Sequence, residues 1–68
     1  PASDFVRITN FDKELNSNDI QVMDVVGNLL DASFFNQGND LELNIEQFPS
    51  GMYFINHPSW NKPLQFIK

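Results

Sequence analysis

The chain contains no cysteine, so a fold that depends on disulfide bonds is excluded. No run approaches the ~20 apolar residues of a membrane-spanning helix, and the n-region and h-region of a secretory signal peptide do not occur in these residues. Sixty-eight residues form at most one small domain. Such a domain buries only about 60% of the surface that its unfolded chain exposes. Apolar packing therefore has to stabilise the fold without a disulfide or an evident metal site.

Positive charge is scarce, because four Lys and Arg stand against nine Asp and Glu, giving a net charge of −5. Nucleic-acid binding requires clustered basic side chains that neutralise phosphates. Anionic membrane surfaces also attract basic rather than acidic proteins. Both kinds of partner are therefore disfavoured. The one charge asymmetry is a mildly basic C-terminal end, which carries Lys62 and Lys68.

Histidine occurs once, as His57 in the segment Asn56-His57-Pro58-Ser59-Trp60. Without cysteine, a nucleophile would have to be a Ser or Thr activated by this histidine, and Ser59 is the nearest in sequence. The G-x-S-x-G elbow of many hydrolases is absent. We therefore expect a turn histidine and no enzymatic activity, and no cofactor is predicted.

One polar loop has a pattern that resembles part of a calcium site. Oxygen-bearing side chains alternate in it, as in the first half of a calcium-binding loop: Asp12, Glu14, Asn16 and Asn18. However, Ser17 stands where an EF-hand needs Gly, and Met23 stands where it needs a bidentate Glu. A weak irregular calcium site is the alternative, and a solvated polar loop without metal is the prediction.

The sequence does contain short apolar–polar alternations separated by turn signals, which are typical of β-strands. Seven Phe, one Trp and one Tyr are expected to supply much of the core, because aromatic side chains bury the most area. No stretch shows a sustained helical period with caps. The pattern predicts an all-β fold, a small antiparallel immunoglobulin-like β-sandwich of about six to seven short strands. The expected strands are Asp4–Thr9, Ile20–Val26, Leu29–Phe35, Leu41–Ile45, Met52–Asn56 and Pro63–Ile67.

Two hairpin turns are predicted between these strands. The first is Asp24–Gly27, a type I turn in which Gly27 takes the left-handed conformation and forms a bulge. The second is Gln37–Asp40, which contains a glycine and an asparagine. Each of these turns would join two neighbouring antiparallel strands.

The segment Leu43–Ile55 has a further turn signal at Phe48–Gly51, with Pro49 at its second position. Tyr53 follows Gly51 by two residues, at the start of an expected strand. This arrangement resembles the tyrosine corner of immunoglobulin-like sandwiches, in which the hydroxyl bonds upstream backbone. An ordinary hairpin with a half-buried Tyr53 is the alternative, and the spacing leaves both open.

Taken in order, these motifs resemble the C-terminal sorting domain of type IX secretion substrates in Bacteroidota. That family typically shows an Asp-x-x-Gly hairpin, a Leu-Pro-x-Gly-x-Tyr segment and a short terminal strand that carries lysine. The matching positions are Asp24 and Gly27 for the hairpin, Pro49, Gly51 and Tyr53 for the corner, and Lys62, Phe66, Ile67 and Lys68 for the terminal strand. Phe48 replaces the usual Leu. The family also typically shows an Asn-Pro near its start, and the Asn that would precede Pro1 lies outside the chain.

The resemblance implies that residues 1–68 form a single sorting domain within a longer secreted protein, and a start at Pro rather than Met fits an excised part. The cargo domain would lie N-terminal to it. The implied partners are the outer-membrane type IX translocon and a sortase-like peptidase, which cleaves the domain and attaches the cargo to surface lipopolysaccharide. The protein would be exported across the outer membrane to the cell surface or the medium.

The terminal strand is the predicted recognition element, since a partner can add a strand to an exposed sheet edge. Its expected contact residues are Lys62, Pro63, Phe66, Ile67 and Lys68. Pro63 suits the first residue of a strand or an edge position. Phe66 and Ile67 would lie on opposite faces, and the lysines would supply charge. The alternative is that Leu64 and Phe66 complete the core and that both lysines are solvated.

A second functional class is an extracellular carbohydrate-binding or adhesion module. In this reading His57 and Trp60 form a ligand platform within the loop Asn56–Lys62, whose amides and lysine bond a sugar. The alternative role for Trp60 is to close one end of the core. A dimer formed by exchange of an edge strand is a further hypothesis, because the core is small and the sheet edges are open.

Overall fold

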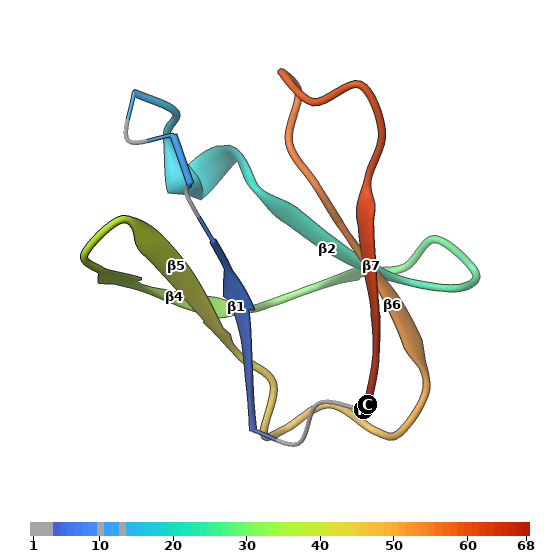
Figure 1. Cartoon of the computed structure of the whole chain (residues 1–68). Helices are drawn as coiled ribbons and strands as arrows, with labels where there is room; N and C mark the ends of the chain where they lie inside the picture. Colours follow the sequence, from blue (N-terminus) through green and yellow to red (C-terminus); the bar gives the residue numbers. More distant parts are fainter. Residues whose placement is uncertain (1–3, 10, 13) are drawn as a thin grey trace.

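The computed structural model describes residues 4–9, 11–12 and 14–68, and it is a sandwich of two antiparallel sheets (Figure 1). Its seven strands are β1 (Phe5–Ile8), β2 (Gln21–Asp24), β3 (Leu29–Leu30), β4 (Ser33–Gln37), β5 (Asp40–Asn44), β6 (Met52–Asn56) and β7 (Leu64–Ile67). The only helical segment among the described residues is the 3-10 turn η1 (Ser17–Asp19). No helix in this part of the chain has the length and apolarity to cross a membrane. The predicted all-β sandwich is confirmed.

The strands divide into a three-stranded sheet, in the order β1-β5-β4, and a four-stranded sheet, in the order β3-β2-β6-β7. We call these the first and the second sheet. Every strand pair is antiparallel. Connections that join the two sheets therefore fall between β1 and β2, between β3 and β4, and between β5 and β6. The last of these crossings carries most of the specific side-chain contacts described below.

The predicted single strand Leu29–Phe35 is wrong, because the structure divides it between the two sheets. β3 pairs with β2, and β4 pairs with β5. Residues 31 and 32 make the crossing, while the burial alternates without a break from Leu30 through Ala32 to Phe34. Alternation reports which side chains face the core, and it does not report which sheet a residue joins. The change of sheet was therefore invisible in the sequence pattern.

The predicted strand Ile20–Val26 also extends too far. β2 ends at Asp24, and Val25 and Val26 form the exposed tip of the hairpin. The Asp24 carboxylate accepts hydrogen bonds from the backbone N–H groups of Val26 and Asn28, at 3.0 and 2.9 Å. Gly27 has a φ of 90°, which confirms its predicted left-handed conformation. The backbone N–H of Asn28 and the other donors of the turn lower the pKa of Asp24 below its ordinary value of 3.8.

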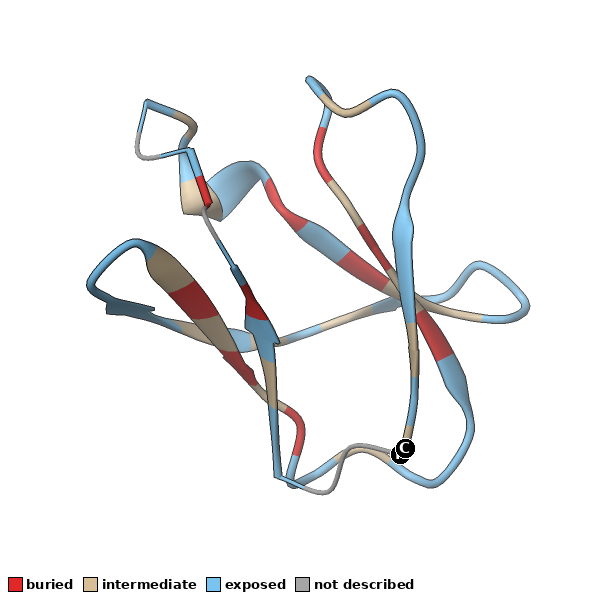
Figure 2. Ribbon diagram, in the orientation of Figure 1, coloured by how far each residue is buried: buried red, intermediate tan, exposed pale blue. Residues whose placement is uncertain are grey.

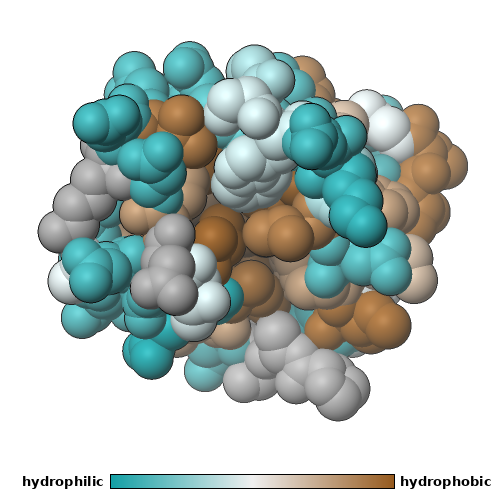
Figure 3. Space-filling model, turned by 45° about the horizontal axis from the view of Figure 1, so that its top comes forward, coloured by the Kyte–Doolittle hydropathy of each residue, from teal (hydrophilic) through white to brown (hydrophobic). Residues whose placement is uncertain are grey.

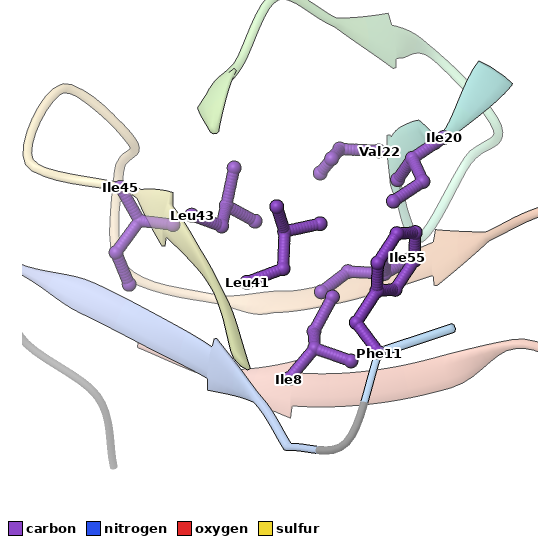
Figure 4. Close-up of a cluster of buried hydrophobic side chains, with 8 residues drawn as sticks. All are labelled: Ile8, Phe11, Ile20, Val22, Leu41, Leu43, Ile45 and Ile55. Carbon is purple, nitrogen blue, oxygen red and sulfur yellow. The ribbon is translucent and has the colours of Figure 1, made fainter. Parts of the chain in front are cut away.

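The core lies between the sheets and is mainly aliphatic (Figure 4). Its buried cluster consists of Ile8, Phe11, Ile20, Val22, Leu41, Leu43, Ile45 and Ile55. The expectation that aromatic residues would supply much of this core holds only in part. Phe11 and Tyr53 are buried, while Phe34, Phe48, Trp60 and Phe66 pack around the aliphatic centre and are partly exposed. Figure 2 shows the buried positions as short stretches that are spread along strands of both sheets.

The connection from β5 to β6 is a tyrosine corner and not a hairpin. The Tyr53 hydroxyl donates a hydrogen bond to the backbone carbonyl of Pro49. The Tyr53 ring is buried between two other aromatic rings, with centroid distances of 5.1 Å to Phe48 and 5.3 Å to Phe66. β5 and β6 belong to different sheets, so the corner carries the chain across the sandwich. This result decides between the two alternatives that the sequence left open.

The hydrogen-bonded turn in this connection lies earlier than predicted. The Phe48 N–H donates to the Ile45 carbonyl at 3.0 Å, so the turn spans Ile45–Phe48 instead of Phe48–Gly51. Gly51 has instead joined the ladder of the second sheet, where it exchanges two backbone hydrogen bonds with Lys68. Proline and glycine signalled the change of direction here, but tertiary pairing decided which residues close the turn.

Replacing Tyr53 with Phe is expected to lower the free energy of unfolding by about 1 kcal/mol, the usual net value of one hydrogen bond. The ring and its contacts with Phe48 and Phe66 would remain. The measurement is urea denaturation followed by tryptophan fluorescence. Ser50→Ala, an exposed change in the same connection, serves as the control and should stay within about 0.5 kcal/mol. Equal stability of the wild type and the Phe variant would contradict the role assigned to this hydroxyl.

Candidate functional site

The terminal strand β7 is an edge strand that pairs only with β6. Gly51 and Lys68 exchange N–H···O bonds of 3.1 and 2.9 Å, so they form a hydrogen-bonded pair. Such pairs alternate with non-bonded pairs along an antiparallel ladder. Gln65 and Ile67 occupy the alternate positions, and their backbone N–H and C=O groups therefore point away from β6. β7 presents an open edge, and most of the strand is exposed in Figure 2.

The side chains of β7 are divided between the two faces of the sheet. Phe66 turns inward and stacks on Tyr53 with an interplanar angle of 22°. Ile67 lies opposite Met52 on the outer face and is 53% exposed. The predicted placement of Phe66 and Ile67 on opposite faces is therefore confirmed. Pro63 is exposed and immediately precedes β7, one residue from its predicted place within the strand.

Lys68 is neither a free charge for a partner, as predicted, nor solvated, as in the alternative. Its ammonium group donates hydrogen bonds to three backbone carbonyls of the β5–β6 connection, those of Ile45, Glu46 and Phe48, at 2.8, 2.9 and 2.8 Å. An ammonium group has three hydrogens, so these bonds use all of them. Lys62, in contrast, is exposed. Lys68 therefore joins the end of β7 to the tyrosine corner, and Lys62 presents its charge to solvent.

The loop between β6 and β7 brings His57 and Ser59 together. His57 Nδ1 accepts a hydrogen bond from the Ser59 N–H at 3.1 Å and lies 2.8 Å from Ser59 Oγ. This contact places the ring proton on Nε2, which is buried without a partner among the described residues. A catalytic base is normally oriented by a third group, as in a triad. The contact between neighbouring residues instead fits the predicted turn histidine.

Trp60 lies beside this histidine at the end of the sandwich, with a distance of 5.8 Å between the ring centroids. His57 is buried, and Trp60 is partly exposed and packs against the core. Of the two residues in the predicted ligand platform, only Trp60 therefore presents part of its ring to solvent. Its predicted role in closing one end of the core agrees with this packing.

A groove of about 540 Å³ runs beside Trp60. Ile8, Phe11 and Leu15 line it from the β1 side, and Leu64 lines it from the β7 side. Figure 3 brings this end of the molecule forward and shows hydrophobic side chains in a hollow between hydrophilic loops. The groove could not be predicted from the sequence, because the residues that line it belong to two distant parts of the chain, from Ile8 to Leu15 and from Ser59 to Leu64. No local pattern indicates that these segments meet.

Two side chains of the loop that was the alternative calcium site make hydrogen bonds within the loop. Asp12 Oδ1 accepts a hydrogen bond from the Glu14 N–H, and Asn16 Oδ1 accepts one from the Asn18 N–H, both at 2.9 Å. All four of these side chains are exposed. Within the described residues no group of three or more His, Cys, Asp or Glu is placed to hold a metal ion. Lys13, in the same loop, lies outside the described residues. The arrangement is that of a solvated loop with local caps.

The family model described as "secretion system C-terminal sorting domain" matches residues 1–65. The chain belongs to this family. The resemblance to type IX sorting domains, inferred from the order of the turns and the corner, is therefore confirmed. Neither the curated proteins nor the solved structures gave a match. The match ends at Gln65, so Phe66, Ile67 and Lys68 lie beyond it.

Membership of the sorting-domain family establishes the broad role of this chain. It is a C-terminal sorting signal for type IX secretion, and the protein that carries it is exported through that system. A sorting domain interacts with the secretion machinery and follows a cargo domain. The family is not a catalytic one.

Replacing Lys68 with Met removes the ammonium group and keeps an apolar stem of similar length. We expect the free energy of unfolding to fall by about 2 kcal/mol, because hydrogen bonds made by charged groups contribute about 1.5–3 kcal/mol. Urea denaturation measures the change. The matched control is Lys62→Met, at an exposed position, which should change the value by less than about 0.5 kcal/mol. If both variants lose the same stability, Lys68 does not have the structural role that its contacts indicate.

Proposed function

We propose that residues 1–68 form one sorting domain of a longer secreted protein and that the outer-membrane type IX translocon recognises it through β7. A partner strand pairs with the open edge of β7, and a sortase-like peptidase then separates the domain from its cargo. One observation carries this proposal. The backbone N–H and C=O groups of Gln65 and Ile67 point away from β6, toward the open edge of the sheet, where no strand pairs with them. Strand addition at such an edge gives affinity through the main chain and specificity through side chains.

The residues predicted for recognition take different parts in this proposal. Ile67 offers an exposed apolar side chain next to the open backbone groups. Lys62 offers a solvated charge, and Pro63 leaves the edge at the start of the strand without an N–H donor. Phe66 and Lys68 hold the strand in place through Tyr53 and the corner carbonyls. Recognition and support are thus divided between alternate residues of one strand.

The arrangement of the chain ends supports the proposed processing step. The Ile45 N–H donates to the Asp4 carbonyl at 2.8 Å, and the Ile45 carbonyl accepts from the Lys68 ammonium group. Asp4, which directly precedes β1, and the end of β7 therefore lie at the same end of the sandwich (Figure 1). A peptidase that acts on the segment before Asp4 would work beside a translocon component bound to β7. The released cargo would then reach the cell surface or the medium.

A non-catalytic role follows from the same proposal. The Ser59–His57 contact is explained by the turn in which both residues lie. We infer that the domain acts by binding alone.

The experiment uses a secreted cargo fused to this domain in a bacterium that has a type IX system. Gln65→Pro removes the outward N–H of β7 and adds a ring on the open edge, whereas the N–H groups that pair with β6 remain. Gln65→Ala is the matched control, because it changes the same side chain and keeps the N–H. We expect the Ala variant to be exported normally and the Pro variant to accumulate inside the cell.

Two further measurements make this result decisive. Circular dichroism and urea denaturation of the full fusion test whether Gln65→Pro keeps its fold. A folded Pro variant that is exported like the wild type would overturn recognition through the β7 edge. Deletion of residues 63–68 tests the function more broadly, and normal export of the deleted fusion would overturn the role of the terminal strand in sorting.

Ligand binding at the Trp60 loop is a second candidate function, and the groove beside Trp60 favours it. Its volume of about 540 Å³ falls in the range of small-molecule sites, about 300–1,000 Å³. Trp60 and Leu64 provide apolar walls, and Asp12 and Asn61 provide polar groups at the rim. A sugar would stack on the indole and bond these side chains.

A glycan array tests this second candidate. We expect binding that disappears in Trp60→Ala and persists in Phe35→Ala, an aromatic position on the outer face of the other sheet. An array without any signal for the wild type would reject carbohydrate binding. Loss of the signal in both variants would indicate contact with the protein surface in general, and it would also count against the groove.

A further inference from the structure

The outer face of the second sheet contains no charged side chain. Its eight outward positions are those that alternate with the inward residues Val22, Leu30, Tyr53, Ile55 and Phe66 along the four strands. The eight residues are Gln21, Met23, Leu29, Met52, Phe54, Asn56, Gln65 and Ile67. Five of them are apolar, and the other three are amides.

The first sheet provides an internal comparison of the same size. Its outward positions, derived in the same way from the ladder, are Phe5, Arg7, Ser33, Phe35, Gln37, Asp40, Glu42 and Asn44. Three of these eight are charged, and Arg7 and Glu42 form an ion pair at 3.4 Å. The charged residues at the outward positions of the two sheets therefore lie on the outer face of the first sheet and not on that of the second, which we call the neutral face.

The apolar residues of the neutral face are contiguous. The strand register places Leu29, Met23 and Phe54 in one row across β3, β2 and β6, and Met52 and Ile67 in the next row. Leu29 is 62% exposed, Met52 is 38% exposed, and Ile67 is 53% exposed. Ile67 also belongs to the open edge of β7. The neutral face and the proposed recognition edge are thus one continuous surface.

We propose that this face is a docking surface for an uncharged, apolar protein surface of the export machinery, which covers the face and the adjoining β7 edge together. The inference rests on the proposed sorting function and adds the second surface through which the partner binds. Interfaces of stable complexes have apolar centres from which charged residues are depleted, and an exposed apolar patch of a few hundred Å² on a soluble protein is often functional.

A second copy of the domain does not fit this face as well as a larger partner does. Four strands about 4.8 Å apart, which are two to five residues long, outline an area on the order of 250 Å². Stable complexes bury about 800 Å² on each partner. Two copies that each carry a net charge of −5 would also repel one another. The same charge opposes binding to an anionic membrane. A larger protein that also wraps the β7 edge reaches the required area.

The test places a charge on the neutral face far from β7. Leu29→Glu is suitable because β3 lies at the opposite edge of the sheet, so the β7 edge is unchanged. The matched control is Phe35→Glu, which adds the same charge at a position that is 46% exposed on the other face. In the cargo fusion, we expect export of Leu29→Glu to fall roughly tenfold, since a charge buried in an apolar interface is costly. Phe35→Glu should be exported like the wild type.

The outcomes separate this inference from the proposed function. If Gln65→Pro blocks export and Leu29→Glu is exported normally, the neutral face is not a docking surface, and recognition through the edge stands. If neither variant affects export, both proposals fail. If the two Glu variants reduce export equally, the loss comes from added charge in general, and the docking inference is overturned. Urea denaturation of each fusion shows whether the variants are folded, and the pair Leu29→Lys and Phe35→Lys replaces the Glu pair if either Glu variant is not.

Other occupants of the face are tested on the isolated fusion. Light scattering that finds a wild-type dimer and a Leu29→Glu monomer would assign the face to self-association, including exchange of an edge strand. Co-sedimentation with phosphatidylethanolamine–phosphatidylglycerol vesicles that is lost in Leu29→Glu would assign it to lipid. Either result would overturn the assignment to a protein of the export machinery.

Discussion

The structure depends on the clamp that closes the crossing from β5 to β6. Lys68 donates to three carbonyls of this connection, and the Tyr53 hydroxyl donates to a fourth, that of Pro49. A connection between sheets cannot satisfy its carbonyls within a ladder, and unsatisfied polar groups that leave water are costly. Two side chains supply the missing donors, one from the start of β6 and one from the end of β7. The two sheets are therefore joined by polar contacts at a corner as well as by the aliphatic core.

This clamp gives the terminal strand two tasks that are usually assigned to different parts of a protein. Through Phe66 and Lys68, β7 holds the corner and extends the core. Through Gln65 and Ile67, it presents an open edge. The alternation of a strand permits this division, because successive residues point to opposite faces and successive backbone groups point to opposite edges. A signal of this kind has its shape only when the whole domain is folded.

Much of this fold could be predicted from local patterns. The Asp24–Gly27 hairpin, the inward set Leu41, Leu43 and Ile45, and the strand Met52–Asn56 depend on alternation and turn chemistry, which are properties of neighbouring residues. The three bonds of Lys68 could not be predicted, because their acceptors lie 20 to 23 residues away and are backbone atoms without a sequence signature. The groove beside Trp60 was missed for the same reason. The sequence pattern identified strands well, but it did not identify which strands meet.

The contrast between the two outer faces adds a constraint that stability alone does not impose. A small domain with little buried area gains solubility from charge on every exposed face, and the first sheet follows this expectation through Arg7, Asp40 and Glu42. The second sheet lacks such charges, although an apolar face beside an open edge strand favours aggregation. Retaining an apolar surface beside an open edge is unfavourable for an isolated domain. It becomes favourable if a larger partner covers both during export, and the neutral face and the β7 edge are then two parts of one binding surface.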